Sequence, residues 1–292
     1  GTINYYYYGQ YLVATLIKLT GILPSVAFNL AVPTLFALTV LSVFGVAYNL
    51  MGGRRESQSG AGPAMTRNAR LGYSLVAGLF VVVVGNLNGM VQLVEGFSKN
   101  SPATFQSGIP GLEGAVRLVT GLVATFSQRL PLPSFDYWRS TRLIPNTINE
   151  FPFFSYLFAD LHAHMIGIPF TVLVLALALN LAKGGRHRGP GEETAEPAGV
   201  GVALLGLFVF AVSLGALAAI NSWDVPTYLG ILLCALVIRE WSVDRQVRPL
   251  TTVARFIAIV GVALLLYAPF FQNYQALSVG IGLTTTRTTL AD

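Results

Sequence analysis

Charge is scarce in this sequence. Only 11% of its 292 residues are Asp, Glu, Lys or Arg, whereas a soluble globular domain carries about 25%. Hydrophobic residues make up 53%, and they occur in blocks close to the length of about 20 residues that crosses the hydrocarbon core of a bilayer. This composition excludes water as the solvent for most of the chain. We therefore predict an all-α fold, a polytopic bundle of transmembrane helices.

Cysteine is almost absent as well. Cys234 is the single cysteine and lies inside an apolar run, so an intrachain disulfide framework and a cysteine-based metal cluster are both excluded. The formal charge is +5, but the arginines lie in short loops between apolar blocks rather than in patches interleaved with exposed aromatics. This pattern argues against nucleic acid as a partner.

The two ends of the sequence lack the features of natural termini. The chain starts at Gly1 without an initiator Met, and no charged segment leads into a short apolar one, so no signal peptide is visible. The last residues, 284–292, are polar. We therefore expect residues 1–292 to form a single transmembrane domain that is a fragment of a longer chain.

The apolar runs predict about six spanning helices and one helix at the membrane interface. Residues 11–23 are too short to cross the bilayer and are followed by Pro24, so we expect them to lie along the interface. An amphipathic stretch at 112–129 falls within a longer segment, 95–150, between two spans. The expected spans are 26–50, 71–94, 166–181, 200–220, 225–238 and 251–271.

The loops between these spans predict an orientation. Loops rich in Lys and Arg stay on the cytoplasmic side of a membrane, and here the basic residues gather at alternate ends of the spans. We therefore expect an integral protein of the cell membrane with these loops inside, and with the segment 95–150 and the other polar motifs outside. The basic loop residues are Arg54, Arg55, Arg67, Arg70, Lys183, Arg186, Arg188 and Arg239.

Asp160, His162 and His164 form the densest group of ionisable side chains, just before the third expected span. If this stretch is helical, Asp160 and His164 share a face because they are four residues apart, and His162 points away. A carboxylate and imidazoles could hold a divalent cation, for which these three residues are the predicted ligands, or act as a general base with an orienting partner. The alternative is a pair of interfacial histidines that caps a helix start.

The short connection before the fifth expected span contains Asn221, Trp223 and Asp224. Asp224 precedes Val225 and a proline, an arrangement typical of a helix N-cap. The functional interpretation is that Asp224 and Asp160 converge on one outer pocket, where they could share a metal that clamps phosphate oxygens. Both interpretations stay open at the level of sequence.

Arg139 and Arg142 lie in a stretch of aromatic and hydroxyl residues, 137–142, and Arg139 directly follows Trp138. Guanidinium groups beside an aromatic ring suit a lipid-linked diphosphate, because their fork binds phosphate through two hydrogen bonds. Contacts with lipid headgroups are the alternative. Glu150, which precedes Phe151 and a proline, places an acid at the membrane entrance and is a further catalytic candidate.

Four consecutive tyrosines, Tyr5 to Tyr8, lie near the start of the sequence. They are typical of an aromatic belt at the membrane interface. Stacking of Tyr6 and Tyr7 on a sugar or lipid headgroup is the alternative. Asn86 and Asn88, inside the second expected span, are interpreted as polar contacts between packed helices.

Four ordered strings carry a family resemblance: NYYYYG at 4–9, EFPFFS at 150–155, DLHAH at 160–164 and NSWDVPTY at 221–228. Together they resemble the YYY membrane protein family, also called the Chlor-Arch-YYY domain, over most of the chain. The layout of that family is similar to that of GT-C glycosyltransferases, polytopic enzymes that use polyprenyl-phosphate sugars. The resemblance implies a GT-C-like bundle and a further catalytic acid upstream of Gly1.

The resulting hypothesis is a transferase that passes a sugar from a polyprenyl phosphate to an acceptor at the outer face. Its partners are membrane lipid and the lipid-linked donor, and its cofactor is a divalent cation. A transporter or flippase for a lipid-linked or polar solute and a non-catalytic membrane scaffold are the alternatives. The catalytic candidates are Asp160, His164, Glu150 and Asp224, and the substrate-binding candidates are Tyr6, Tyr7, Trp138, Arg139, Arg142, His162, Asn221 and Trp223.

Overall fold

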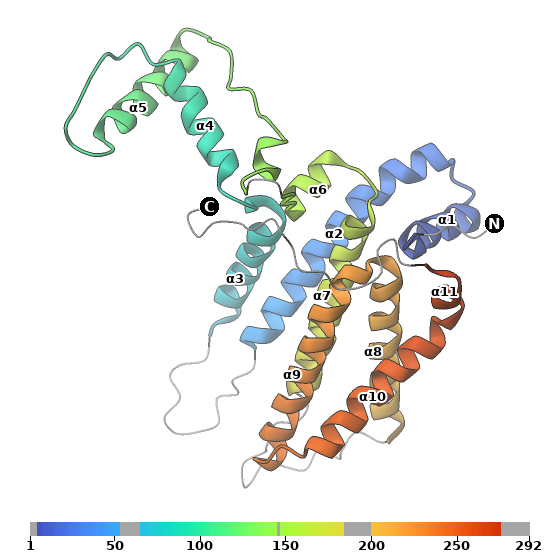
Figure 1. Ribbon diagram of the computed structural model, residues 1–292. Coiled ribbons are helices and arrows are strands. Elements are labelled where there is room, and N and C mark those ends of the chain that lie inside the picture. Colours follow the sequence, from blue (N-terminus) through green and yellow to red (C-terminus); the bar gives the residue numbers. More distant parts are fainter. Residues whose placement is uncertain (1–4, 53–64, 145–146, 184–199, 276–292) are drawn as a thin grey trace, which may run out of the picture. The chain divides into compact units, whose positions relative to one another are not determined.

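The computed structural model describes residues 5–52, 65–144, 147–183 and 200–275 (Figure 1). All regular secondary structure in these ranges is helical, which confirms the predicted all-α fold. The described residues divide into two compact units. Unit 1 contains the parts of the chain before residue 84 and after residue 158, and unit 2 contains 84–158.

Some residues used in the prediction of orientation lie outside the described ranges. They are Arg54, Arg55, Arg186 and Arg188 in the basic loops. The first residue of the NYYYYG string, Asn4, and the polar residues 284–292 also lie outside them.

Unit 1 contains the membrane-spanning helices. Among the described residues, five helices are long and apolar enough to cross a membrane. The fourth expected span, 200–220, forms the helix α8 (Val200–Ile220), which has an apolar part at Leu204–Ile220. The five candidate spans are Pro24–Met51, Arg67–Val84, Ala163–Lys183, Ser222–Ser242 and Pro249–Leu266.

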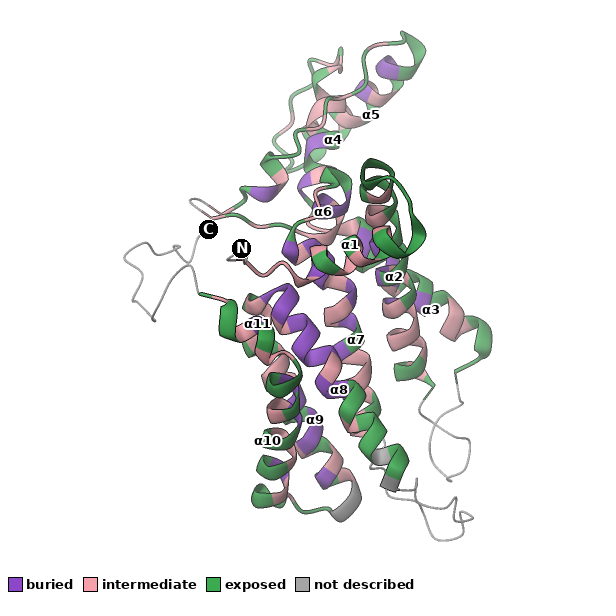
Figure 2. Ribbon diagram, turned by 90° about the vertical axis from the view of Figure 1, so that its right-hand side faces the viewer, coloured by how far each residue is buried: buried purple, intermediate pink, exposed green. Residues whose placement is uncertain are grey.

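The helix α7 (Ala163–Lys183) is the centre of unit 1. It packs against α2 (Pro24–Met51), α8 and α9 (Val225–Asp244), and α10 (Pro249–Leu266) packs against α8 and α9. Large apolar side chains elsewhere on the spans are exposed, as expected for helices that face lipid. The buried core comes from α7 to α10 (Figure 2) and includes Val174, Ala178, Phe210, Leu214, Leu217, Leu232, Leu236, Ile259 and Ala263.

The prediction of a second span over 71–94 is wrong for the residues after Val84. The helix α3 (Arg67–Leu79) passes into a π-helical turn, Phe80–Val84, and the chain then breaks at Gly85, whose φ of 54° is left-handed. Such a φ is easily adopted only by glycine. The Gly and Asn residues at 85–89 are typical of a turn and mark this break in the sequence, but the apolar residues on both sides favoured one continuous span.

The two asparagines predicted to join packed helices lie at that break instead. The side chain of Asn86 accepts a hydrogen bond from the backbone N–H of Asn88 (3.1 Å) and donates one to the carbonyl of Ser140 (2.6 Å). These bonds satisfy backbone groups that the end of a helix leaves open. Their role is therefore within unit 2, at the start of α4 (Asn88–Lys99).

The expected interfacial segment forms a separate helix, α1 (Tyr8–Thr20), which ends at Gly21 with a φ of 69°. It packs closely on α7. A Cβ atom at Gly9 would lie 2.7 Å from Cγ2 of Ile166, nearer than two carbon atoms can approach. The absence of a side chain at Gly9 therefore allows α1 to contact the first turn of α7.

Unit 2 is built on two packed helices. The predicted amphipathic stretch forms α5 (Leu112–Ser127), which packs against α4, and two short elements follow: η2 (Arg139–Thr141) and α6 (Pro152–Phe158). The backbones of α4 and α5 approach so closely that a Cβ at Gly121 would lie 1.9 Å from the carbonyl oxygen of Phe97. The side-chain amide of Asn100 donates to the hydroxyl of Thr125 at 2.9 Å.

Candidate functional site

The group of Asp160, His162 and His164 precedes α7 rather than forming its first turn. Ala159 has a left-handed φ of 60°, and the helix begins at Ala163. The carbonyl of His162 accepts the N–H of Ile166 (3.0 Å), so His162 is the residue at which the helical hydrogen bonds start. The prediction that Asp160 and His164 share one helix face is therefore wrong.

The structure instead pairs Asp160 with His162. The carboxylate Oδ2 of Asp160 is hydrogen-bonded to Nδ1 of His162, and the backbone N–H of His162 donates to the carbonyl of Asp160 at 2.7 Å. With the proton on Nδ1, the lone pair of Nε2 is free to accept another proton. The side chains are 43% and 56% exposed, so this carboxylate–imidazole pair is open to a substrate.

The helix α1 supports the pair from one side. The side chain of Gln10 donates to the carbonyl of Leu161 at 3.1 Å, and its Oε1 is buried without a hydrogen-bond partner among the described residues. Burial raises the pKa of the Tyr5 phenol, and the neighbouring Tyr6 and the charge of Asp160 add to the shift. These contacts place the start of α1 beside Asp160.

A second polar pair, Asn221 and Asp224, lies against the first turns of α7. The amide of Asn221 is buried and donates to Oδ2 of Asp224 at 2.9 Å. A Cβ at Gly167 would lie 3.5 Å from the same oxygen, and the charge of His164 acts on the Asp224 carboxylate. Asp224 is at the N-cap position of α9, but its side chain makes no capping hydrogen bond, so capping does not explain it.

The two polar pairs thus lie at one end of unit 1, and basic residues lie at the other. At that opposite end, Lys183 donates to the backbone carbonyl of Asn49, and Arg70 donates to that of Tyr48 at 3.0 Å. The predicted sorting of motifs and basic residues to opposite ends of the helices is present in unit 1. Which end faces the outside of the cell stays a prediction.

The tyrosine run packs at the same end as the polar pairs. The Tyr7 ring lies 5.7 Å from that of Phe270, and the Tyr6 ring lies 4.3 Å from Tyr5 and 6.2 Å from Tyr274. The rings therefore hold α1 to the segment after α10, and stacking of Tyr6 and Tyr7 on a ligand stays a prediction. Trp223 is 74% exposed and is the aromatic ring next to Asp224 that a ligand could reach.

The three predicted metal ligands are not arranged as a metal site in this conformation. The described ranges contain no group of three or more His, Cys, Asp or Glu side chains positioned to hold a metal ion. The imidazole rings of His162 and His164 lie 5.6 Å apart, centroid to centroid. The divalent cation stays a prediction.

The predicted phosphate-binding arginines lie in unit 2, where each has partners. Arg139 forms two hydrogen bonds with Glu95, at 2.6 and 2.9 Å, and these bonds lower the pKa of that carboxyl. Arg142 donates to the hydroxyl of Thr141 at 2.6 Å and lies 5.7 Å above the ring of Trp138. A phosphate would have to displace Glu95 in order to bind the guanidinium of Arg139. The catalytic role of Glu150, which lies before α6, stays a prediction.

Sequence reasoning missed Glu240. This carboxylate is 4% exposed and accepts hydrogen bonds from the N–H of Arg248 (2.9 Å), the hydroxyl of Thr252 (2.7 Å) and the guanidinium of Arg255 (3.1 Å). The signal was an acid directly after the fifth expected span, next to Arg239, where an acid near the membrane is expected to be paired or functional. It lies at the end opposite the polar pairs, and its bonds join α9 to α10.

Comparison with known protein families matches residues 1–292 to a family described as "Uncharacterized membrane protein (DUF2298)". Neither the curated proteins nor the solved structures contain a match to the chain. The match covers every residue, agrees with the helical spans of unit 1, and confirms the resemblance to an uncharacterised YYY-type membrane family. The chain therefore belongs to the DUF2298 family of membrane proteins.

Proposed function

We propose that this protein transfers a sugar from a polyprenyl phosphate to an acceptor hydroxyl, as GT-C-type enzymes do. The observation that carries the proposal is the hydrogen-bonded pair of Asp160 and His162, half exposed at one end of an apolar helical bundle. A base at the end of membrane-spanning helices lies near the bilayer surface, where the phosphate of a lipid-linked sugar is also located.

In this reaction, Nε2 of His162 accepts the proton of the acceptor hydroxyl while the hydroxyl oxygen bonds to the anomeric carbon of the sugar. The bond between that carbon and the phosphate oxygen breaks, and polyprenyl phosphate leaves with the bonding electrons. The carboxylate of Asp160 holds the imidazole in the required tautomer and stabilises the imidazolium that forms.

The second pair would position the acceptor. The carboxylate of Asp224 accepts hydrogen bonds from sugar hydroxyls, and Asn221 fixes its orientation. The exposed ring of Trp223 offers an apolar face on which a sugar ring can stack. These contacts are those of a binding subsite next to the base.

Hydroxyl groups in the spans favour a transferase over a transporter. Thr39, Ser74 and Ser213 donate to carbonyls of their own helices, at 2.9, 2.7 and 2.9 Å. These hydrogen bonds direct the three hydroxyls to the backbone of their own helices. A transporter would need polar groups aimed between the helices along the depth of the bilayer.

The test is turnover of a polyprenyl-phosphate sugar by the full-length protein in liposomes. Asp160→Asn and His162→Ala should each lower turnover by about 100-fold or more, because a positioned general base contributes at least that factor. Glu113→Gln, which removes the exposed ion pair with Arg117 in α5, is the control and should keep normal turnover.

Unchanged turnover in both Asp160→Asn and His162→Ala would contradict the proposed reaction. Movement of the intact lipid-linked sugar across the membrane, without transfer, would instead support the transporter.

A further inference from the structure

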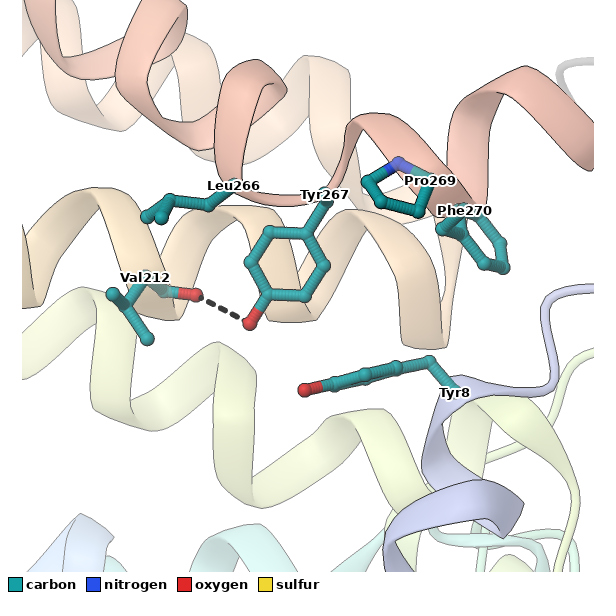
Figure 3. Close-up of a pocket in the computed structure, with 6 residues that line it drawn as sticks. All are labelled: Tyr8, Val212, Leu266, Tyr267, Pro269 and Phe270. Atoms are coloured by element: carbon teal, nitrogen blue, oxygen red, sulfur yellow. Dashed lines mark hydrogen bonds between the residues drawn. The ribbon is translucent and has the colours of Figure 1, made fainter.

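A cleft of about 330 Å³ lies in unit 1, lined by residues that the proposed reaction does not use. Its walls come from α1, α8, the end of α10, and α11 (Ala268–Asn273) (Figure 3). None of the lining side chains carries a charge. They are Tyr8, Val212, Leu266, Tyr267, Pro269 and Phe270.

The cleft is formed by the break between α10 and α11. Tyr267 leaves the helix, and its ring lies flat on α8, where a Cβ at Gly215 would be 2.4 Å from it. Its hydroxyl donates to the carbonyl of Val212 at 3.1 Å, and the ring of Tyr8 lies 5.3 Å away. Figure 3 shows both tyrosine hydroxyls pointing to the same side, toward Val212.

The walls stay neutral. A phenol is protonated at physiological pH, and the Tyr267 hydroxyl donates its proton to the Val212 carbonyl. Most of the remaining lining is apolar, and its polar groups include the Tyr8 hydroxyl and the Val212 carbonyl. An ion would lose its hydration there without a charged partner. The cleft therefore suits a hydrocarbon.

The cleft continues the surface of the spans that faces lipid. Beside it, Leu264 and Leu265 on α10 and Phe208 and Val209 on α8 are exposed large apolar residues. In a membrane protein such helix surfaces contact the acyl chains of the bilayer. If the recess were empty, the side chains of its walls would lack dispersion contacts on one side. An acyl chain that enters from the bilayer supplies these contacts.

We propose that this cleft holds one acyl chain of a bilayer phospholipid. The occupant is a phospholipid because the recess opens from the surface that bulk phospholipid already covers. The bound chain bridges α1, α8 and α11, so the lipid joins the helix that supports Asp160 to the end of α10. This lipid site is independent of the proposed sugar transfer.

The test uses the full-length protein in phosphatidylcholine vesicles that contain a phosphatidylcholine with a photoreactive acyl chain. After irradiation, mass spectrometry of the peptides locates the labelled residues. Val212→Trp fills the cleft, and Val209→Trp places the same ring on the lipid-facing side of the same helix. We expect labels on the peptide of Tyr267 to Phe270 in the unaltered protein and in Val209→Trp, and loss of most of them in Val212→Trp.

Equal labelling of that peptide in Val212→Trp and Val209→Trp would overturn the proposal. So would displacement of the label by an equimolar polyprenyl phosphate, which would identify an isoprenoid chain as the occupant. If Val212→Trp does not fold, Leu266→Trp fills the cleft from the opposite wall and is read in the same way. If the protein transferred no sugar but kept the Val212→Trp-sensitive labelling, the lipid site would be supported and the proposed sugar transfer would not.

Discussion

At the scale of the residue, Glu240 shows how an apolar bundle accommodates a buried charge. Its carboxylate accepts three hydrogen bonds from residues at the start of α10, one of them from the guanidinium of Arg255. An isolated carboxylate in an apolar medium is strongly unfavourable, so these bonds are required rather than optional. The acid therefore fixes the end of α9 against the start of α10.

Replacing Glu240 with Ala should destabilise the protein by about 1–3 kcal/mol, because the buried hydroxyl of Thr252 loses its acceptor while the partly exposed Arg255 can turn to solvent. Glu113→Ala is the matched control: it removes an exposed pair with Arg117 on one helix and should cost less than about 1 kcal/mol. Unfolding in detergent measures both. Equal effects of the two substitutions would contradict the structural role of Glu240.

At the scale of the element, the packing of α4 on α5 depends on one glycine. A Cβ at Gly121 would overlap the carbonyl of Phe97, whereas a Cβ at Gly114, on the same helix, would meet no atom within 4 Å. Gly121→Ala should therefore separate α4 from α5 and lower the stability of unit 2 by about 1–3 kcal/mol. Gly114→Ala should leave it unchanged or slightly raise it.

Thermal unfolding and hydrogen exchange of α4 and α5 measure this difference. If the amides of α4 and α5 exchanged as slowly in Gly121→Ala as in Gly114→Ala, the two helices would not pack as closely as described.

The contact between α4 and η2 should depend on pH. Hydrogen bonds from Arg139 lower the pKa of Glu95 in the folded protein. A carboxyl with a lowered folded pKa stabilises the fold above its unfolded pKa, and this contribution disappears as the pH falls through the folded pKa. The coupling between Glu95→Gln and Arg139→Gln, from a double-mutant cycle, should be measurable at pH 7 and should decrease as the pH falls through the folded pKa of Glu95.

A coupling that grew on acidification would show that the two side chains do not form an ion pair. High salt should weaken the coupling at neutral pH, because both side chains are partly exposed.

The sequence predicted most helices because long apolar runs have few structural alternatives in a membrane. It did not predict the break after Val84, because the apolar residues on both sides of 85–89 outweighed the Gly and Asn residues within it, which are typical of a turn. The same limit applies before α7. A left-handed Ala159 depends on local packing, and it changed which imidazole meets Asp160.

At the scale of the whole molecule, the distribution of charged and polar motifs was the most informative sequence signal. It correctly indicated that Asp160 and Asp224 lie at the same end of their helices, because spans of similar length alternate in direction. It could not indicate that Glu95 pairs with Arg139, or that Glu240 is enclosed by α10, since both contacts join residues distant in the sequence.

The proposed sugar transfer requires the polar pairs of unit 1 to face the outside of the cell together. In a Cys234→Ala background, single cysteines at Asp160, at Trp223 and at Leu250, the last exposed at the start of α10, can be labelled with a membrane-impermeant maleimide. We predict that Asp160→Cys and Trp223→Cys react in intact cells, and that Leu250→Cys reacts only after permeabilisation. Reaction of Asp160→Cys and Trp223→Cys from opposite sides of the membrane would contradict the account.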